Sequence, residues 1–99
     1  MIKGTTPTHT FRLPFDTSII KEVMVIYAQN EMEVFHKDKY ECEFSGKKII
    51  VKLSQEETLL FNHRQNVQIQ VRVLTNDDVA VASQIKEITI QNCLNSGVI

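Results

Sequence analysis

The sequence predicts an all-β fold: an immunoglobulin-like β-sandwich of seven or eight short antiparallel strands with one short helical turn near residues 55–60. Two observations point to this class. Residues 67–73 alternate four branched apolar residues with three polar ones, which is the period of a strand with one buried and one wet face. The remaining strand-like segments are short and recur roughly every ten residues, as in a sandwich or a small barrel. A small β-barrel is the alternative architecture.

The first two predicted strands differ in character. Residues 5–15 alternate loosely and include Pro7 and Pro14. Because proline has no N–H to donate to a ladder, we expect an edge strand there, followed by a turn at residues 16–18. Residues 20–29 are apolar on both parities, which indicates a central strand that is covered on both sides or lies in an interface.

Two hairpins are expected next. Asn30 and Glu31 separate the central strand from a strand at residues 32–36, and asparagine tolerates the left-handed conformation of a tight turn. After a charged loop at residues 37–39, a strand at 42–44 turns at Ser45 and Gly46 into a strand at 48–53. In that last strand Ile49, Val51 and Leu53 share one side.

A short helix and a β-meander complete the expected fold. Ser54 and Glu57 have the spacing of a capping box, which predicts a helical turn that lays residues 59–61 across one end of the sandwich. A loop at 62–66 leads to the strand at 67–73. Turn residues 75–78 and the segments 79–82 and 85–90 then predict a meander. Residues 1–94 form a single sandwich domain in this interpretation, and residues 95–99 form a C-terminal tail.

Composition favours one domain that folds by itself. The chain has 99 residues, of which 42% are hydrophobic and 23% charged, and its formal net charge is −1. This balance provides no cationic field for phosphates or anionic lipid, so neither nucleic acid nor membrane is an expected partner. Residues 1–7 lack the apolar stretch of a signal peptide, and no run of about 18 apolar residues occurs. We therefore expect a soluble, cytoplasmic protein.

No residue pattern predicts catalysis, a metal or a cofactor. His9, His36 and His63 follow one another at intervals of 27 residues, without the short spacing of zinc ligands. His36 shares strand parity with Met32 and Val34, so we expect it to be a packed or half-exposed strand residue, and we expect the other two histidines to be exposed. Cys42 and Cys93 form no CxxC motif; free thiols are expected, with Cys42 buried as a small hydrophobe. The adjacent Glu56 and Glu57 suit the positive end of a helix, and three isolated glycines form no phosphate loop.

Two surfaces are candidates for protein contacts. Gln68, Gln70 and Arg72 form the polar face of the 67–73 strand, which we interpret as a solvated sheet face, since no aromatic residue interleaves for base stacking. The unpaired backbone of the first strand is a second candidate, because a sheet edge can add to the sheet of another subunit. A homo-oligomer is therefore a possible assembly. No specific binding residue is assigned.

The chain resembles a family of small uncharacterised proteins encoded in phages and prophages of Gram-positive bacteria. The resemblance spans almost the whole chain and rests on five segments: residues 4–11, 13–16, 27–30, 53–58 and 71–75. The late hairpin also resembles the immunoglobulin-like modules of phage baseplate and tail proteins. These resemblances imply a phage origin and a virion-associated or assembly role, and they assign no functional residue.

The leading hypothesis is a non-enzymatic phage or prophage structural or accessory protein that acts through protein contacts, in the host bacterial cytoplasm or on the virion. The alternative is a small phage-encoded antagonist that binds a host protein. A third hypothesis, an enzyme or ligand-binding module, would require a concave pocket with converging titratable groups.

Overall fold

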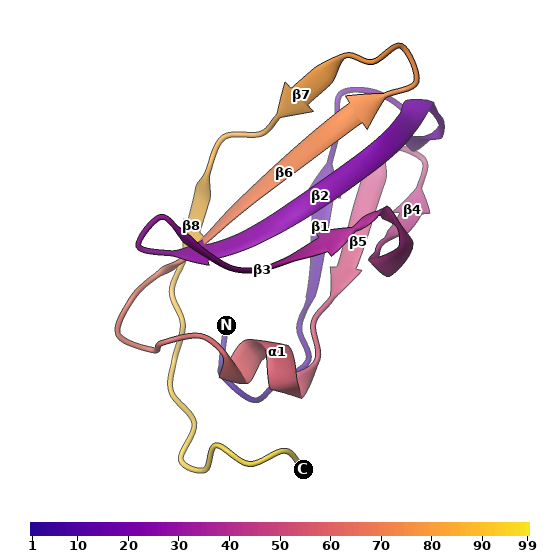
Figure 1. Ribbon diagram of the computed structural model, residues 1–99. Coiled ribbons are helices and arrows are strands. Elements are labelled where there is room, and N and C mark those ends of the chain that lie inside the picture. The colour runs from indigo at the N-terminus through magenta and orange to yellow at the C-terminus, as the bar shows by residue number, and fades with distance from the viewer.

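The computed structural model describes residues 1–99, which form eight strands in two antiparallel sheets (Figure 1). The large sheet has the order β3 (Met32–Asp38), β2 (Ile20–Gln29), β6 (Val67–Thr75), with β7 (Ala80–Ala82) and β8 (Lys86–Ile88) both paired with the far side of β6. The small sheet has the order β1 (Thr8–Arg12), β5 (Lys48–Lys52), β4 (Glu43–Ser45). The helix α1 (Gln55–Leu59) lies at one end, and two short 3₁₀ turns are η1 (Thr17–Ile19) and η2 (Lys39–Glu41).

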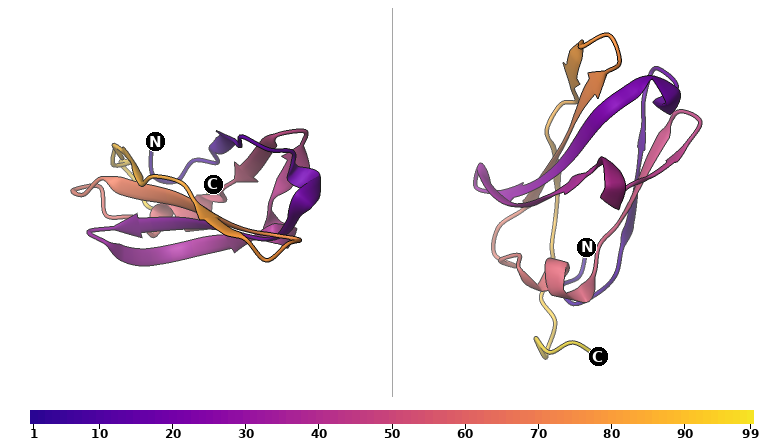
Figure 2. Two further views of the ribbon diagram at one scale, coloured as in Figure 1. Left: turned by 90° about the horizontal axis from the view of Figure 1, so that it is seen from above. Right: turned by 45° about the vertical axis from the view of Figure 1, so that its right-hand side comes forward.

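The all-β sandwich is the predicted fold class, and its strand order, which the sequence did not predict, is that of an immunoglobulin-like sandwich. If β1 to β6 are taken as strands B, C, C′, D, E and F, and β7 with β8 as an interrupted G, the sheets have the orders D-E-B and C′-C-F-G. The helix α1 then occupies the connection between E and F. Figure 2 shows the two sheets as separate layers, which excludes the closed barrel, and shows the C-terminal segment extending past the end that carries α1.

The core lies between the inner faces of the two sheets. In β6 the residues Val67, Ile69, Val71 and Val73 are at most 5% exposed, so the predicted two-residue period is confirmed. Ile49, Val51 and Leu53 oppose them from the other layer and are at most 2% exposed. The capping box is also as predicted: the Glu57 N–H donates to Ser54 Oγ, and the Ser54 N–H donates to Glu57 Oε1.

The first strand is an edge strand, as its prolines predicted. It pairs with β5 on one side only, and its ladder is extended by the Leu53 N–H, which donates to the carbonyl of Pro7. Pro7 lies just before β1, and Pro14 lies two residues beyond its last residue. Both prolines therefore flank the ladder, where a missing N–H costs no hydrogen bond.

Three predictions about individual segments were wrong. The charged loop expected at residues 37–39 is the end of β3 and the start of η2, and Lys37 is only 8% exposed. The expected meander is absent, because β7 and β8 both pair with β6 instead of with each other. The predicted common parity of Met32, Val34 and His36 is broken by a register shift opposite Tyr27 and Ala28, and Val34 packs against the core.

Ser83 explains the break between β7 and β8. Its N–H donates to the carbonyl of Val71 at 2.8 Å, and its Oγ accepts the Val71 N–H at 3.0 Å. The serine side chain thus replaces a backbone carbonyl in the ladder, and the edge strand bends there before pairing resumes at Lys86. The sequence analysis separated the segments 79–82 and 85–90, but it did not predict that both would pair with β6 or that the Ser83 side chain would join the ladder between them.

The hairpin between β2 and β3 allows a stabilising substitution. Asn30 and Glu31 have φ values of 51° and 63°, which define the tight hairpin turn that was predicted and place a glutamate in the left-handed region. Replacing Glu31 with glycine should raise the free energy of unfolding by about 0.5–1 kcal/mol, because glycine adopts this conformation without strain. Urea denaturation measures the change. Gly46 has a φ of 59°, so Gly46→Ala should lower the free energy of unfolding. If both substitutions changed the free energy of unfolding in the same direction, this account would be contradicted.

Candidate functional site

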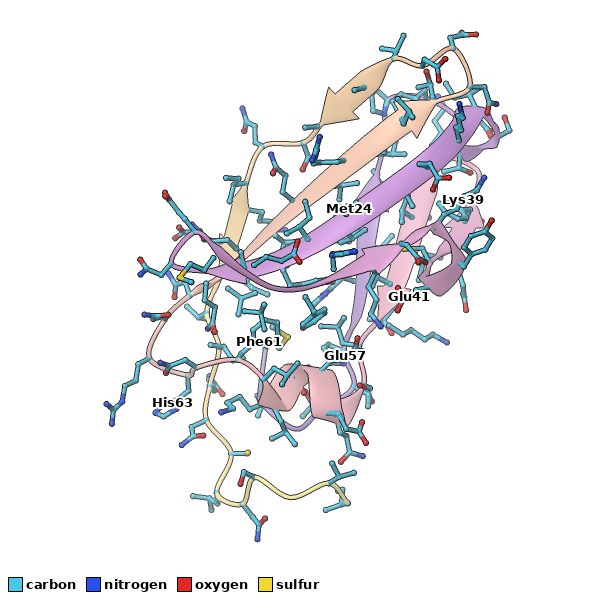
Figure 3. All side chains as sticks on the ribbon, in the orientation of Figure 1. Met24, Lys39, Glu41, Glu57, Phe61 and His63 are labelled. Carbon is cyan, nitrogen blue, oxygen red and sulfur yellow. The ribbon has the colours of Figure 1, made fainter.

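The histidines and acidic residues form no chemical cluster. His63 is exposed in the loop after α1 and points away from the sheets in Figure 3. His36 is on the outer side of the large sheet, with its Nδ1 3.1 Å from Glu33 Oε2. No group of three or more His, Cys, Asp or Glu side chains converges to hold a metal ion. These residues therefore provide no candidate catalytic or metal centre.

His9 is the one histidine whose environment differs from the prediction. It is half-buried on the inner side of β1, and its Nδ1 lies 2.7 Å from the Tyr27 hydroxyl. Burial, together with the nearby positive charge of Lys86, lowers the pKa of His9, and burial raises that of Tyr27. The ring of Phe35 stacks on the ring of Tyr27, with the two centroids 5.0 Å apart. This polar pair satisfies two core groups. His9 also lines a pocket of about 210 Å³ between β1 and β8, in which Lys86 is the only other titratable residue.

The outer face of the large sheet is the candidate contact surface of this molecule. Strand pairing places the outward side chains of β2 beside those of β6 and β7: Met24 is opposite Arg72, Ile26 opposite Gln70, and Leu74 opposite Ala80. The apolar side chains on this face are either half-buried against their neighbours or exposed. No other layer of the structure covers them. They are Met24, Ile26, Ala28, Leu74, Ala80, Ala82 and Ile85. Figure 3 labels Met24 on this front sheet.

Two shallow grooves hollow this face. The first, of about 340 Å³, is lined by ten residues, including Met24, Leu74, Ala80 and Ala82. The second, of about 350 Å³, contains Ile26, Ala28 and Ile85 among its lining residues. The small alanine side chains of β7 and β2 leave the space, because neighbouring positions on the same face carry longer side chains. The outer face can therefore receive protruding apolar side chains of another protein.

The two glutamines of this face are held in place by hydrogen bonds. Gln70 Nε2 donates to the carbonyl of Ser83 at 3.0 Å, and Gln68 Oε1 accepts the Glu31 N–H at 2.8 Å. A side chain whose amide is already bonded loses less freedom when a partner covers it. The outward side of β6 is thus polar, as predicted. Its two glutamines are ordered by their hydrogen bonds and lie among the apolar side chains of β2 and β7 on the same face.

Carboxylates surround the apolar part of the outer face. Five acidic side chains and one guanidinium lie on it or at its margin: Glu22, Glu31, Glu33, Asp38, Glu87 and Arg72. Arg72 has no carboxylate within ion-pair distance, although it lies between the acidic positions, and Glu22, Glu31 and Glu87 have no cationic partner. The face therefore presents apolar side chains inside a predominantly negative margin.

The region below the large sheet contains a buried ion pair. Lys37 Nζ lies 2.6 Å from Glu57 Oε2 and 3.7 Å from Glu41 Oε2, which joins β3 to α1 and η2. Figure 3 labels the two carboxylates, Glu57 on α1 and Glu41 on η2. Burial by itself raises the pKa of Glu57, but the hydrogen bonds from Lys37 and Ser54 outweigh it and hold the pKa below its usual value. We assign this pair a structural role, because both charges are satisfied within the fold.

The two cysteines are free thiols in the structure, and both are half-buried. Cys42 packs against the core, which agrees with its expected role as a small hydrophobe, although it is not fully buried. Burial, with Glu41 and Asp38 nearby, raises the pKa of Cys42 to about 11. Thiolate is the reactive form, so this cysteine is protected at neutral pH.

This protection can be measured. In a Cys93→Ser variant, the remaining Cys42 should react with a disulfide reagent at pH 8 about 100-fold more slowly than the same variant unfolded in urea, because roughly one thiol in a thousand is ionised at a pKa of about 11. The rate should rise steeply above pH 9. A native rate that matches the unfolded one would show that Cys42 is exposed and ionised.

No family model, curated protein or solved structure significantly matches the chain. No helix of the structure has both the length and the apolar character needed to cross a membrane. Sequence reasoning found the two halves of the site separately, the apolar strand at residues 20–29 and the polar side of residues 67–73, but did not place them on one face. The pairing of β2 with β6 brings them together.

Proposed function

We propose that this chain is a non-enzymatic protein-binding domain that works through the outer face of the large sheet. The observation that carries the proposal is the uncovered apolar side of β2, where Met24, Ile26 and Ala28 lie beside the grooves. A two-layer sandwich needs apolar residues on its inner faces only, so apolar residues on an outer face are typical of a contact surface.

The proposal extends to a phage or prophage structural or accessory protein, located in the host bacterial cytoplasm or on the virion. Its support is the resemblance of the sequence segments given above, and its mode of action is contact between rigid sheets. An antagonist of a host protein would use the same face. The absence of a recognisable catalytic constellation in the sequence favours binding over catalysis, because a reaction would need converging titratable groups.

Affinity capture with matched variants tests this function. Ile26 and Ile50 are both half-buried isoleucines on central strands, and they lie on the outer faces of the large and the small sheet. A tagged wild-type chain should capture a partner protein, either another copy or a phage or host protein, in stoichiometric amounts. Ile26→Asp should reduce capture of a phage or host protein at least about tenfold, since it places a charge in the centre of the apolar contact. Where the captured protein is another copy, the same loss is expected when both the tagged and the untagged chain carry Ile26→Asp.

Ile50→Asp is the control. It should still capture a phage or host protein that Ile26→Asp no longer captures. Both variants must first give the wild-type circular dichroism spectrum. If no protein is captured, or if Ile26→Asp captures as well as wild type, the outer face of the large sheet is not the binding surface and the proposal is wrong.

A further inference from the structure

The outer face of the small sheet carries the opposite charge. The register of β1, β5 and β4 places eight side chains outward: Thr8, Thr10, Arg12, Lys48, Ile50, Lys52, Glu43 and Ser45. Three of them are cations and one is a carboxylate, whereas the outer face of the large sheet has five carboxylates and one cation. A chain with a formal net charge of only −1 therefore has a basic side and an acidic side.

The cations of the small sheet have no partners within the molecule. Arg12 is directly opposite Lys48 in the ladder, and like charges in such positions repel each other. None of Arg12, Lys48 and Lys52 lies within ion-pair distance of a carboxylate. Ile50, half-buried, sits among them, so this face has an apolar centre and a positive margin. It is the inverse of the acidic, apolar-centred face on the other side of the sandwich.

From these two faces we infer that the partner of the large sheet is a second copy of this chain, which docks its small sheet there. This inference rests on the proposed function and names the occupant of its surface. Ile50 of one copy enters the apolar centre beside Ile26 of the next, while Arg12, Lys48 and Lys52 approach the acidic margin. Two large sheets facing each other are disfavoured, because their carboxylates would meet.

The contact is head-to-tail, since it joins two different surfaces. Such a heterologous contact leaves one free face at each end of a pair, so addition of copies continues into a stack or closes into a ring. The small sheet limits the contact: two strands of five residues and one of three cover at most about 14 Å by 17 Å at ordinary strand spacing. This footprint is well below the roughly 800 Å² per partner of a stable complex, so we expect a dissociation constant on the order of 0.1 mM.

Sedimentation velocity on the full chain tests the inference. The weight-average mass of the wild type should rise with concentration up to about 1 mM, and the association should weaken about tenfold when NaCl is raised from about 0.1 M to 1 M. Ile26→Asp and Ile50→Asp should each be monomeric. An equimolar mixture of the two variants should give a heterodimer that does not grow further, because each variant retains the face that the other needs.

A second pair of variants keeps the test decisive if either aspartate variant fails to fold. One double variant, Lys48→Glu with Lys52→Glu, reverses the charge of the small-sheet face, and the other, Glu22→Lys with Glu33→Lys, reverses that of the large-sheet face. Each double variant should be monomeric by itself. Their mixture should associate at least as tightly as the wild type. A wild type that stays monomeric at about 1 mM overturns the inference, as does a mixture that stays monomeric. A monomeric wild type that still captures another protein, with Ile26→Asp losing it, overturns self-stacking and leaves the proposed function standing.

Discussion

Replacing Phe61 with alanine is expected to lower the free energy of unfolding by about 3–5 kcal/mol. Phe61 is 1% exposed and follows α1, so its ring closes the end of the sandwich where the two sheets would otherwise admit water. Its ring centroid lies 5.4 Å from that of Phe35 and 6.2 Å from that of Tyr27. Alanine leaves a cavity beside the aromatic side chains of β2 and β3, and strands held in a ladder collapse into it poorly.

Leu60 is the matched control for this prediction. It precedes Phe61 in the chain but is 62% exposed, so Leu60→Ala should change the free energy of unfolding by no more than about 0.5 kcal/mol. Urea denaturation of both variants, with unchanged slopes of the transitions, gives the comparison. Equal destabilisation by the two substitutions would mean that the sandwich end is not closed by Phe61.

Replacing Glu57 with alanine is the second large effect, a loss of about 3 kcal/mol. The change removes the carboxylate 2.6 Å from Lys37 Nζ and leaves that ammonium group, whose side chain is only 10% exposed, with Glu41 at 3.7 Å as its remaining partner. Breaking a buried pair by removing one member is costly because the other charge stays desolvated. The substitution also removes the acceptor of the Ser54 N–H in the capping box, which adds about 1 kcal/mol at most.

Glu56 and Lys37 provide the controls. Glu56→Ala alters the neighbouring residue of the same helix, which is exposed and has no ion pair, and should have little effect. Adding Lys37→Met to Glu57→Ala should restore part of the lost stability, because no unpaired charge then remains in the interior. Guanidinium or urea denaturation curves of the wild type, Glu57→Ala, Lys37→Met and the double variant form a double-mutant cycle. A coupling free energy near zero would show that the pair does not contribute as a unit.

The same pair predicts how stability depends on pH. The pKa of Glu57 is lower in the folded protein than in the unfolded chain, where it is about 4.5, so its contribution is present above that value. As the pH falls below 4.5 and then through the lower folded value, the carboxylate takes up a proton and the contribution is lost. The difference in unfolding free energy between wild type and Glu57→Gln should therefore shrink below pH 4.5. A difference that stays constant from pH 7 to pH 3 would contradict the assignment.

Local patterns predicted the elements whose physics is local. Ser54 and Glu57 lie three residues apart and bond to each other's backbone, so their capping box needs no other part of the chain. The side-chain alternation of β6 predicted its buried face, because a strand in any sheet turns successive residues to opposite sides. Asn30 likewise identified its turn.

Features that depend on pairing were beyond those patterns. Lys37 looks like a loop residue because lysine is rarely buried, and its burial is compensated mainly by Glu57 from the helix α1, 20 positions away. The register shift near Tyr27 and Ala28 arises between two strands, and neither strand reveals it alone. His9 was expected in solvent for the same reason, since its partner Tyr27 lies 18 positions away in another sheet.

The candidate surface shows the same division. By itself the chain determined that residues 20–29 are apolar on both sides and that residues 67–73 have one polar side, because side-chain chemistry and the strand period are properties of each segment. The tertiary structure alone decided that these sides share one face, and that an acidic outer face and a basic outer face lie on opposite layers. The physical reason is that a surface is defined by which strands are neighbours, and neighbours are selected by the packing of the whole core.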